Sequence, residues 1–145
     1  MHRSSAFPPR RDEVASRYSA RLVSEARPTP AGLSHRDAGA TQVVAWSQVR
    51  RALAAEIGEP QGVRTVVFDL ALLGPDPDRV EALRFDAEPG EAAVAVARAL
   101  ALWLPPERLA ASIKSLAADG LAEEWHPDLA SFEEHALAAL AAAGA

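Results

Sequence analysis

Cysteine is absent from this chain of 145 residues, which excludes disulfide bonds, thiol chemistry and zinc sites built on cysteine. Long apolar runs are absent too, because none reaches the roughly 18 residues that a membrane-spanning helix requires. The N-terminal segment also lacks the apolar stretch of a secretory signal peptide. We therefore expect a soluble protein of the cytoplasm, of one-domain length and without a transmembrane segment.

Basic charge is also scarce. Lysine occurs once, as Lys114, and the net charge of −5 corresponds to an isoelectric point near 5.3. An acidic chain gains little from counterion release, so we do not expect it to bind nucleic acid. The preference for arginine over lysine, together with abundant alanine, is typical of a GC-rich bacterial genome. We interpret the arginines of the N-terminal part as a solvated segment rather than a binding arm; they are Arg3, Arg10, Arg11, Arg17, Arg21 and Arg27.

The first two thirds of the chain carry strand signals. Residues 1–17 are rich in serine, proline and arginine, and we expect them to form a disordered tail. Strands are then predicted between the proline- and glycine-rich turns at 27–32, 58–62 and 74–78; the predicted strands are 18–26, 33–46, 63–73 and 79–87. The segment 46–58 fits a helix face and a strand alternation equally well, and both interpretations stay open.

From Pro89 onward the apolar period changes to that of helices. We expect one helix over 89–104, with Trp103 on its apolar face, and a second over 106–119, followed by Gly120 as its C′ residue. A third should begin near Ser131, which has capping-box spacing to Glu134. Strands first and helices last indicate an α+β fold, in which an antiparallel β-meander precedes C-terminal helices.

The stretch TVVFDLALLGPD, residues 65–76, resembles the first motif of haloacid dehalogenase-like hydrolases, Asp-x-Asp-Gly-Thr after an apolar strand. Asp69 would then be the nucleophile. However, Ala71 replaces the second aspartate, which removes a metal ligand and the proton donor. The next strand also follows too soon for a crossover helix. We therefore interpret Asp69 as a strand position beside Val67, on the face opposite to that of Val66, Phe68, Leu70 and Leu72.

A second resemblance concerns the order of the motifs. The sequences GLSHR at Gly32–Arg36 and VAWSQV at Val44–Val49, followed by the meander and the helix 89–104, resemble bacterial pleckstrin-homology-like (PH-like) domains over residues 18–104. Ala45 stands where such domains often carry proline. The resemblance implies a partly open barrel closed by a helix, in which 46–58 is a strand beyond its first turn. Residues 105–145 would be a helical C-terminal extension.

One cluster of histidines and carboxylates lies between Glu123 and His135. His126, Asp128 and His135, together with Glu124, are candidate ligands of a divalent ion. Their spacing matches no established zinc motif, and we favour a loop in which Trp125 packs on the helices, His-Pro-Asp makes a turn, and Glu133 and Glu134 face solvent. On this interpretation the chain has no metal site and no cofactor, and a zinc titration distinguishes the two.

No Gly-x-Ser-x-Gly motif or phosphate-binding loop is present. Some PH-like domains bind phosphoinositides through basic clusters, but Arg21, Arg27 and Arg36 are dispersed, so we do not expect lipid-headgroup binding. The predicted function is that of a non-enzymatic binding or scaffolding domain, which contacts another protein or a second copy of itself through its sheet edges and C-terminal helices. The alternative is a small enzyme or metal-binding module that uses the Glu123–His135 cluster.

Overall fold

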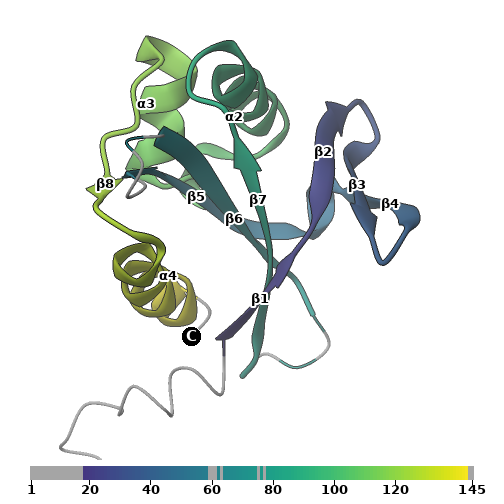
Figure 1. The fold of residues 1–145 in the computed structure, drawn as a ribbon. Helices are drawn as coiled ribbons and strands as arrows, with labels where there is room; N and C mark the ends of the chain where they lie inside the picture. The colour runs from purple at the N-terminus through teal and green to yellow at the C-terminus, as the bar shows by residue number, and fades with distance from the viewer. Residues whose placement is uncertain (1–17, 59–61, 63, 75, 77, 144–145) are drawn as a thin grey trace, which may run out of the picture.

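Two β-sheets and three α-helices make up the computed structural model, which describes residues 18–58, 62, 64–74, 76 and 78–143 (Figure 1). The predicted N-terminal tail and parts of the predicted turns at 58–62 and 74–78 lie outside the described residues. The strands are β1 (Tyr18–Leu22), β2 (Ser24–Thr29), β3 (Gly32–Asp37), β4 (Ala40–Ala45), β5 (Val49–Gly58), β6 (Arg64–Leu72), β7 (Val80–Ala87) and β8 (Trp125–His126). The helices are α2 (Glu91–Trp103), α3 (Ala111–Asp119) and α4 (Leu129–Ala143), with short 3₁₀ turns η1 (Trp46–Gln48) and η2 (Pro106–Arg108).

The larger sheet has five strands in the order β1-β7-β6-β5-β8. Strands β5, β6 and β7 form the predicted antiparallel meander, whereas β1 and β8 join its two edges in parallel to β7 and β5. Strands β2, β3 and β4 form a separate antiparallel sheet that lies beside the larger one (Figure 1). The predicted fold class is confirmed: the chain is α+β, with a curled, largely antiparallel sheet arrangement that forms a partly open barrel and is followed by helices.

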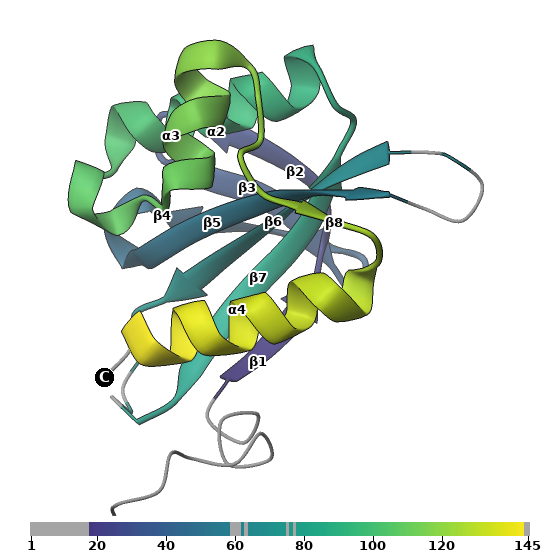
Figure 2. The same ribbon diagram turned by 90° about the vertical axis from the view of Figure 1, so that its left-hand side faces the viewer.

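Both faces of the five-stranded sheet are covered. Helices α2 and α3 and the small sheet cover one face, and α4 runs across the other (Figure 2). The core under α2 and α3 includes Leu33, Trp46, Phe68, Leu83, Leu100 and Ile113. The core under α4 includes Tyr18, Leu53, Ile57, Val67, Phe132 and Leu140.

Strand β6 shows why both faces are apolar. Val66, Phe68 and Leu70 point into the core under α2, where the ring of Phe68 stacks on that of Phe85 at 5.2 Å between centroids, and Leu72 packs against the same core. Val67 and Asp69 point to the α4 side, as predicted from the alternation. A strand buried on both faces reads as a continuous apolar run, which explains the uninterrupted sequence TVVFDLALL.

The ambiguous segment 46–58 is a single 3₁₀ turn followed by a strand. Strand β5 places Ala52 and Ala54 under α2 and α3, and Leu53, Ala55 and Ile57 under α4. The helix-like spacing of its larger residues is therefore a coincidence of two buried faces.

Two predicted strands are each divided in two. The predicted strand 18–26 leaves the large sheet after β1 and enters the small sheet as β2. The predicted strand 33–46 is a hairpin of β3 and β4, which turns at Ala38 and Gly39 with φ values of 53° and 81°. The sequence DAG marks this turn, and a short two-residue loop of this kind requires positive φ.

The helix ends also differ from the prediction. Helix α3 begins at Ala111 rather than 106, because residues 106–108 form the 3₁₀ turn η2, and it ends as predicted at Gly120, whose φ is 74°. Helix α4 begins at Leu129, and Asp128 rather than Ser131 caps it: the Ser131 amide donates to the Asp128 carboxylate at 2.8 Å. No described helix is long and apolar enough to cross a membrane.

The inward faces of the helices are largely as predicted. Leu100 and Leu104 of the first, Ile113 and Leu116 of the second, and Phe132 of the third are buried. The prediction that Trp103 lies on the buried face is wrong. Its side chain is 46% exposed, because it lies at the margin of the apolar stripe in the last turn of α2.

The hairpin of β3 and β4 depends on one close backbone approach. A Cβ at Gly32 would lie 2.0 Å from the carbonyl oxygen of Val44, a contact that no side chain can make. The indole nitrogen of Trp46 donates to the Thr29 carbonyl at 2.9 Å and closes the same corner. The two motifs that carry the PH-like resemblance therefore meet at this corner.

We predict that Gly32→Ala lowers the free energy of unfolding by at least about 2 kcal/mol, because backbone atoms rather than a flexible side chain must move. Urea denaturation followed by circular dichroism measures the change. Gly74→Ala is the matched control, since no atom lies within 4 Å of its added Cβ, and it should change stability by less than about 0.5 kcal/mol. Equal effects of the two substitutions would contradict the proposed constraint.

Candidate functional site

Polar side chains gather at two places around α4. One group lies between the first turns of the helix and the large sheet, and includes Asp69. The other lies between the helix and β8, and includes the histidines of the Glu123–His135 cluster.

The group beneath the helix is a buried ion pair with a tyrosine. Asp69 on β6 and Arg84 on β7 are directly opposite each other in the antiparallel register. Arg84 donates from Nε to Asp69 Oδ1 at 2.8 Å and from Nη2 to Oδ2 at 2.9 Å, which is the bidentate geometry of a strong pair. The Tyr18 hydroxyl of β1 donates to Asp69 Oδ2 and accepts from Arg84 Nη2 at 3.2 Å.

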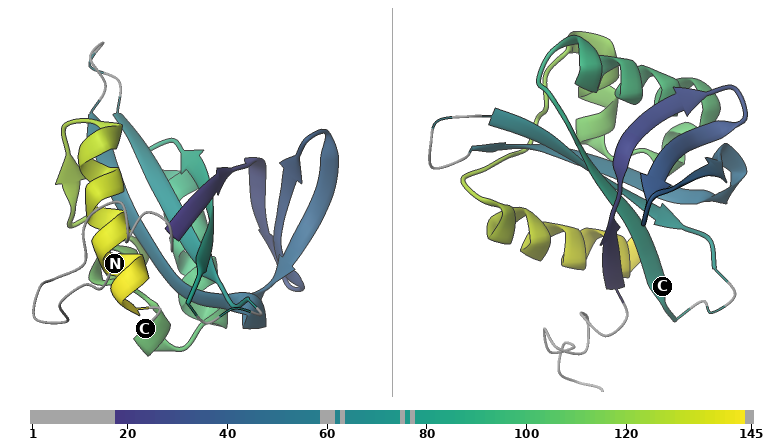
Figure 3. Two further views of the ribbon diagram at one scale, coloured as in Figure 1. Left: turned by 90° about the horizontal axis from the view of Figure 1, so that it is seen from below. Right: turned by 45° about the vertical axis from the view of Figure 1, so that its right-hand side comes forward.

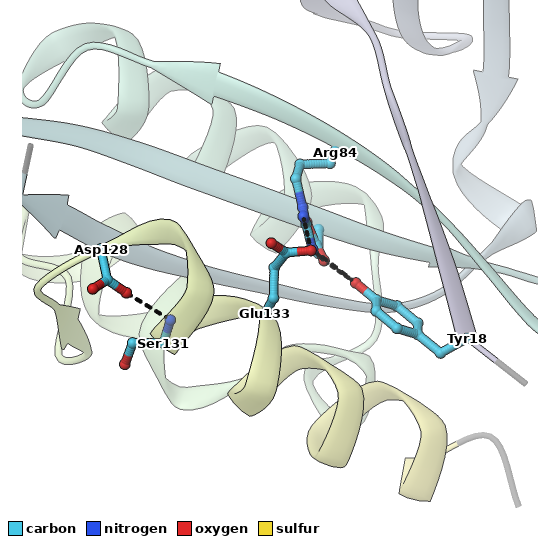
Figure 4. Close-up of polar contacts among 6 residues, drawn as sticks. Tyr18, Arg84, Asp128, Ser131 and Glu133 are labelled. Atoms are coloured by element: carbon cyan, nitrogen blue, oxygen red, sulfur yellow. Dashed lines mark hydrogen bonds and ion pairs between the residues drawn. The ribbon is translucent and has the colours of Figure 1, made fainter. Parts of the chain in front are cut away.

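Helix α4 closes the group from above. Glu133 Oε2 lies 3.4 Å from Arg84 Nη1 (Figure 4). The Arg84 guanidinium carbon lies 5.4 Å from the centre of the Phe132 ring. Glu133 was predicted to face solvent; its side chain is 47% exposed, and its carboxylate is also ion-paired with Arg84. The helix therefore supplies both a second carboxylate and an aromatic face to a guanidinium that is 6% exposed.

The protonation states in this group are held by its surroundings. Burial raises the pKa of Tyr18 well above its ordinary value, and the Asp69 carboxylate raises it further. Burial alone lowers the pKa of Arg84, but the hydrogen bonds and charge of Asp69 outweigh burial and raise it above its ordinary value. The tyrosine is therefore neutral and the arginine charged throughout the physiological range.

The contacts of this group suit a structural role rather than catalysis. Both oxygens of Asp69 are hydrogen-bonded, and the side chain is fully buried, so a phosphate ester cannot reach it. The interpretation of Asp69 as a strand position rather than a nucleophile agrees with this geometry. Sequence reasoning missed its partners, Tyr18 and Arg84, although an arginine between Leu83 and Phe85 in a buried strand was a usable signal.

The second group joins three of the predicted candidate ligands. Glu124, His126 and His135 each offer a ligand atom, and these atoms lie within 4.8 Å of one another. The two imidazole centroids are 5.5 Å apart, and His135 Nε2 lies 2.9 Å from Glu124 Oε2. The described residues thus bring two imidazoles and one carboxylate to one point.

Asp128, the remaining candidate, does not belong to this group, because its carboxylate caps α4 at Ser131 (Figure 4). Trp125 was predicted to pack on the helices, which is wrong: it is 56% exposed and lies against Gly58 of β5. Trp125 and His126 form β8, and alternation along this strand places His126, not Trp125, on the side of α4.

Apart from these two groups, one further polar side chain is buried in the small sheet. His35 of β3 is 1% exposed, and neither of its ring nitrogens has a partner among the described residues. Burial lowers the pKa of His35, and the nearby Arg21 lowers it further, whereas Asp37 raises it. Arg21 and Asp37 form an ion pair at 3.0 Å that joins β1 to β3. His35 is therefore a neutral histidine beside the contact between the two sheets.

We predict that Asp69→Asn lowers the free energy of unfolding by about 3–5 kcal/mol, because the buried Arg84 loses its counter-charge. Tyr18→Phe should cost less, about 1–3 kcal/mol, because it removes only hydrogen bonds within the network. Chemical denaturation of the purified variants measures both.

The double variant Asp69→Leu, Arg84→Met is the control for this prediction. It removes both charges together and should be more stable than Asp69→Asn, since burial of an apolar pair costs no desolvation of charge. A double variant as unstable as the single one would show that the ion pair is not the cause.

No protein-family model matches the chain, and searches of curated proteins and of solved structures found no match. A relationship to bacterial PH-like domains stays a prediction from the motifs Gly32–Arg36 and Val44–Val49. The functional interpretation of this chain therefore depends on the geometry and chemistry of its own residues.

Proposed function

We propose that the chain is a non-enzymatic binding module that acts through protein–protein contacts, with the free edge of β4 as its docking element and a second copy of the chain as its partner. The observation that carries this proposal is the unprotected edge of β4. An exposed strand edge offers a row of backbone donors and acceptors to any strand that can lie beside it.

Among the four sheet edges of the described residues, three carry features that discourage strand addition. Strand β8 has two residues, and β1 has five, among them the ion-paired Arg21. Strand β2 has an irregular register after Ser24, a positive φ at Glu25 and a proline at position 28. Short length, charge, irregular register and proline are the usual protections of an edge.

Strand β4 has none of these protections. It ends the small sheet, it pairs regularly with β3 along its whole length, and its sequence ATQVVA contains no charge, glycine or proline. Its first four residues are exposed, and Val43 is 54% exposed. Figure 3 shows β4 at the outer side of the small sheet, away from the helices.

A second copy suits this edge. Two β4 strands placed antiparallel about a two-fold axis form an isologous contact in which each strand meets its own sequence. Because Ala40–Ala45 contains no charge, no like charges oppose each other across the contact, and the β-branched Thr41 and Val43 favour the paired strand. The net charge of −5 on each copy opposes association at long range, so added salt should strengthen the dimer.

The enzyme alternative gains no support from Asp69, the other sequence candidate for chemistry. Asp69, the one carboxylate at the centre of the large sheet, is closed off by α4.

We predict a weak, concentration-dependent dimer with a Kd of about 10 μM to 1 mM, as expected for a contact that buries little surface. Sedimentation equilibrium over this concentration range measures it. Val43→Lys should weaken the dimer at least about tenfold, because it places a charge of the same sign on both strands at the contact.

Leu102→Lys is the matched control, since Leu102 is 74% exposed on α2 and is also apolar. It should leave the dimer unchanged. A chain that stays monomeric up to about 1 mM, or a dimer that Leu102→Lys weakens as much as Val43→Lys, would overturn the proposal.

A further inference from the structure

We infer that Glu124, His126 and His135 form a binding site for one divalent transition-metal ion, of which zinc is the typical example. The inference goes beyond the proposed docking role of β4 and does not depend on it. It rests on the convergence of three ligand atoms and on one buried imidazole nitrogen that has no partner.

The spacing of the ligand atoms suits a single ion. Zinc binds imidazole nitrogen and carboxylate oxygen at about 2.0–2.2 Å, so two ligands of one ion lie no more than about 4.4 Å apart. The three ligand atoms here lie within 4.8 Å of one another, so small side-chain rotations complete the site. His135 Nε2 and Glu124 Oε2 are 2.9 Å apart but do not have hydrogen-bond geometry, as expected of two atoms directed at a common third atom.

His126 is held in the orientation of a ligand. Its Nδ1 lies 2.8 Å from Ser131 Oγ, whereas its Nε2 is buried and without a partner among the described residues. A metal-binding histidine usually donates from one ring nitrogen to a neighbouring oxygen, which leaves the other nitrogen free for the metal. The Phe132 ring packs edge-on against the imidazole at 5.8 Å and limits its rotation.

The backbone on both sides of the site is fixed without the ion. Glu56 of β5 donates its amide to the Glu124 carbonyl at 3.1 Å, and β8 pairs with β5 through His126. His135 lies on α4, one turn after the fully buried Phe132. The three ligands therefore come from one sheet edge and one helix, both of which the core already places.

Two imidazoles and one carboxylate form a donor set that suits zinc and related transition ions better than calcium or magnesium, which prefer oxygen ligands. Three protein ligands leave a coordination position for water or for a group of another molecule. The side chains of His135 and Glu124 are 38% and 29% exposed, so the site lies at the margin of the core rather than deep within it. The ion would join the β8 segment directly to α4.

Calorimetric titration of the full chain with zinc, after removal of metal by a chelator, tests the inference. We expect saturable binding of one ion per chain, a rise in melting temperature with zinc, and visible absorption typical of low-coordinate cobalt(II) when cobalt replaces zinc. Glu124→Gln, His126→Gln and His135→Gln should each reduce the affinity strongly. Ser131→Ala should reduce it about 10- to 100-fold, because it frees the His126 ring without removing a ligand.

Glu123→Gln and His2→Gln are the matched controls, as an adjacent glutamate and a histidine elsewhere in the sequence, and both should bind zinc like the unmodified chain. Melting curves without metal establish that each variant is folded. Two results would overturn the inference: no saturable heat with the unmodified chain, or unchanged affinity in a folded His126→Gln, His135→Gln double variant.

Discussion

The arrangement of this chain depends on one buried ion pair, Asp69 with Arg84, at the centre of the five-stranded sheet. Removing two charges from water costs several kcal/mol for each, and the cost is offset only where every donor and acceptor is satisfied. Two further elements complete the pair: β1 contributes the Tyr18 hydroxyl, and α4 contributes the Glu133 carboxylate and the Phe132 ring. The first and last described elements of the chain therefore meet over the middle strands. Loss of the ion pair would remove contacts of both elements.

The sheet is apolar on both faces because helices cover both of them. Helices α2 and α3 pack on one side with Phe68, Leu83 and Leu100, and α4 covers the charged pair on the other with Phe132 and Leu140. The two features proposed to bind other molecules lie away from the centre of the large sheet. The Glu124, His126 and His135 group lies where β8 meets α4, and the free edge of β4 lies on the small sheet (Figure 1).

Much of this architecture could be predicted from local patterns. The alternation in β6 and β7, the apolar stripes of the helices, and the turn at Gly120 are all set by residues close in sequence. The division of 18–26 between two sheets could not be predicted, because it depends on pairing with the distant strands β3 and β7. The partners of Asp69 could not be predicted either, because they lie 51 and 15 residues away in the sequence. The group of candidate ligands includes Glu124 but not Asp128, because the Asp128 carboxylate caps α4 instead.

Because the Asp69–Arg84 pair joins α4 to the sheet, we expect residues 105–143 to unfold together with the strands and not as a separate extension. Native-state hydrogen exchange at increasing denaturant tests this directly. We expect the buried amides of α4, at Phe132 and Ala136, to exchange with the same free energy and denaturant dependence as those of β6 at Phe68 and Leu70. Exchange of the α4 amides through a separate opening of lower free energy, while β6 stays protected, would contradict it.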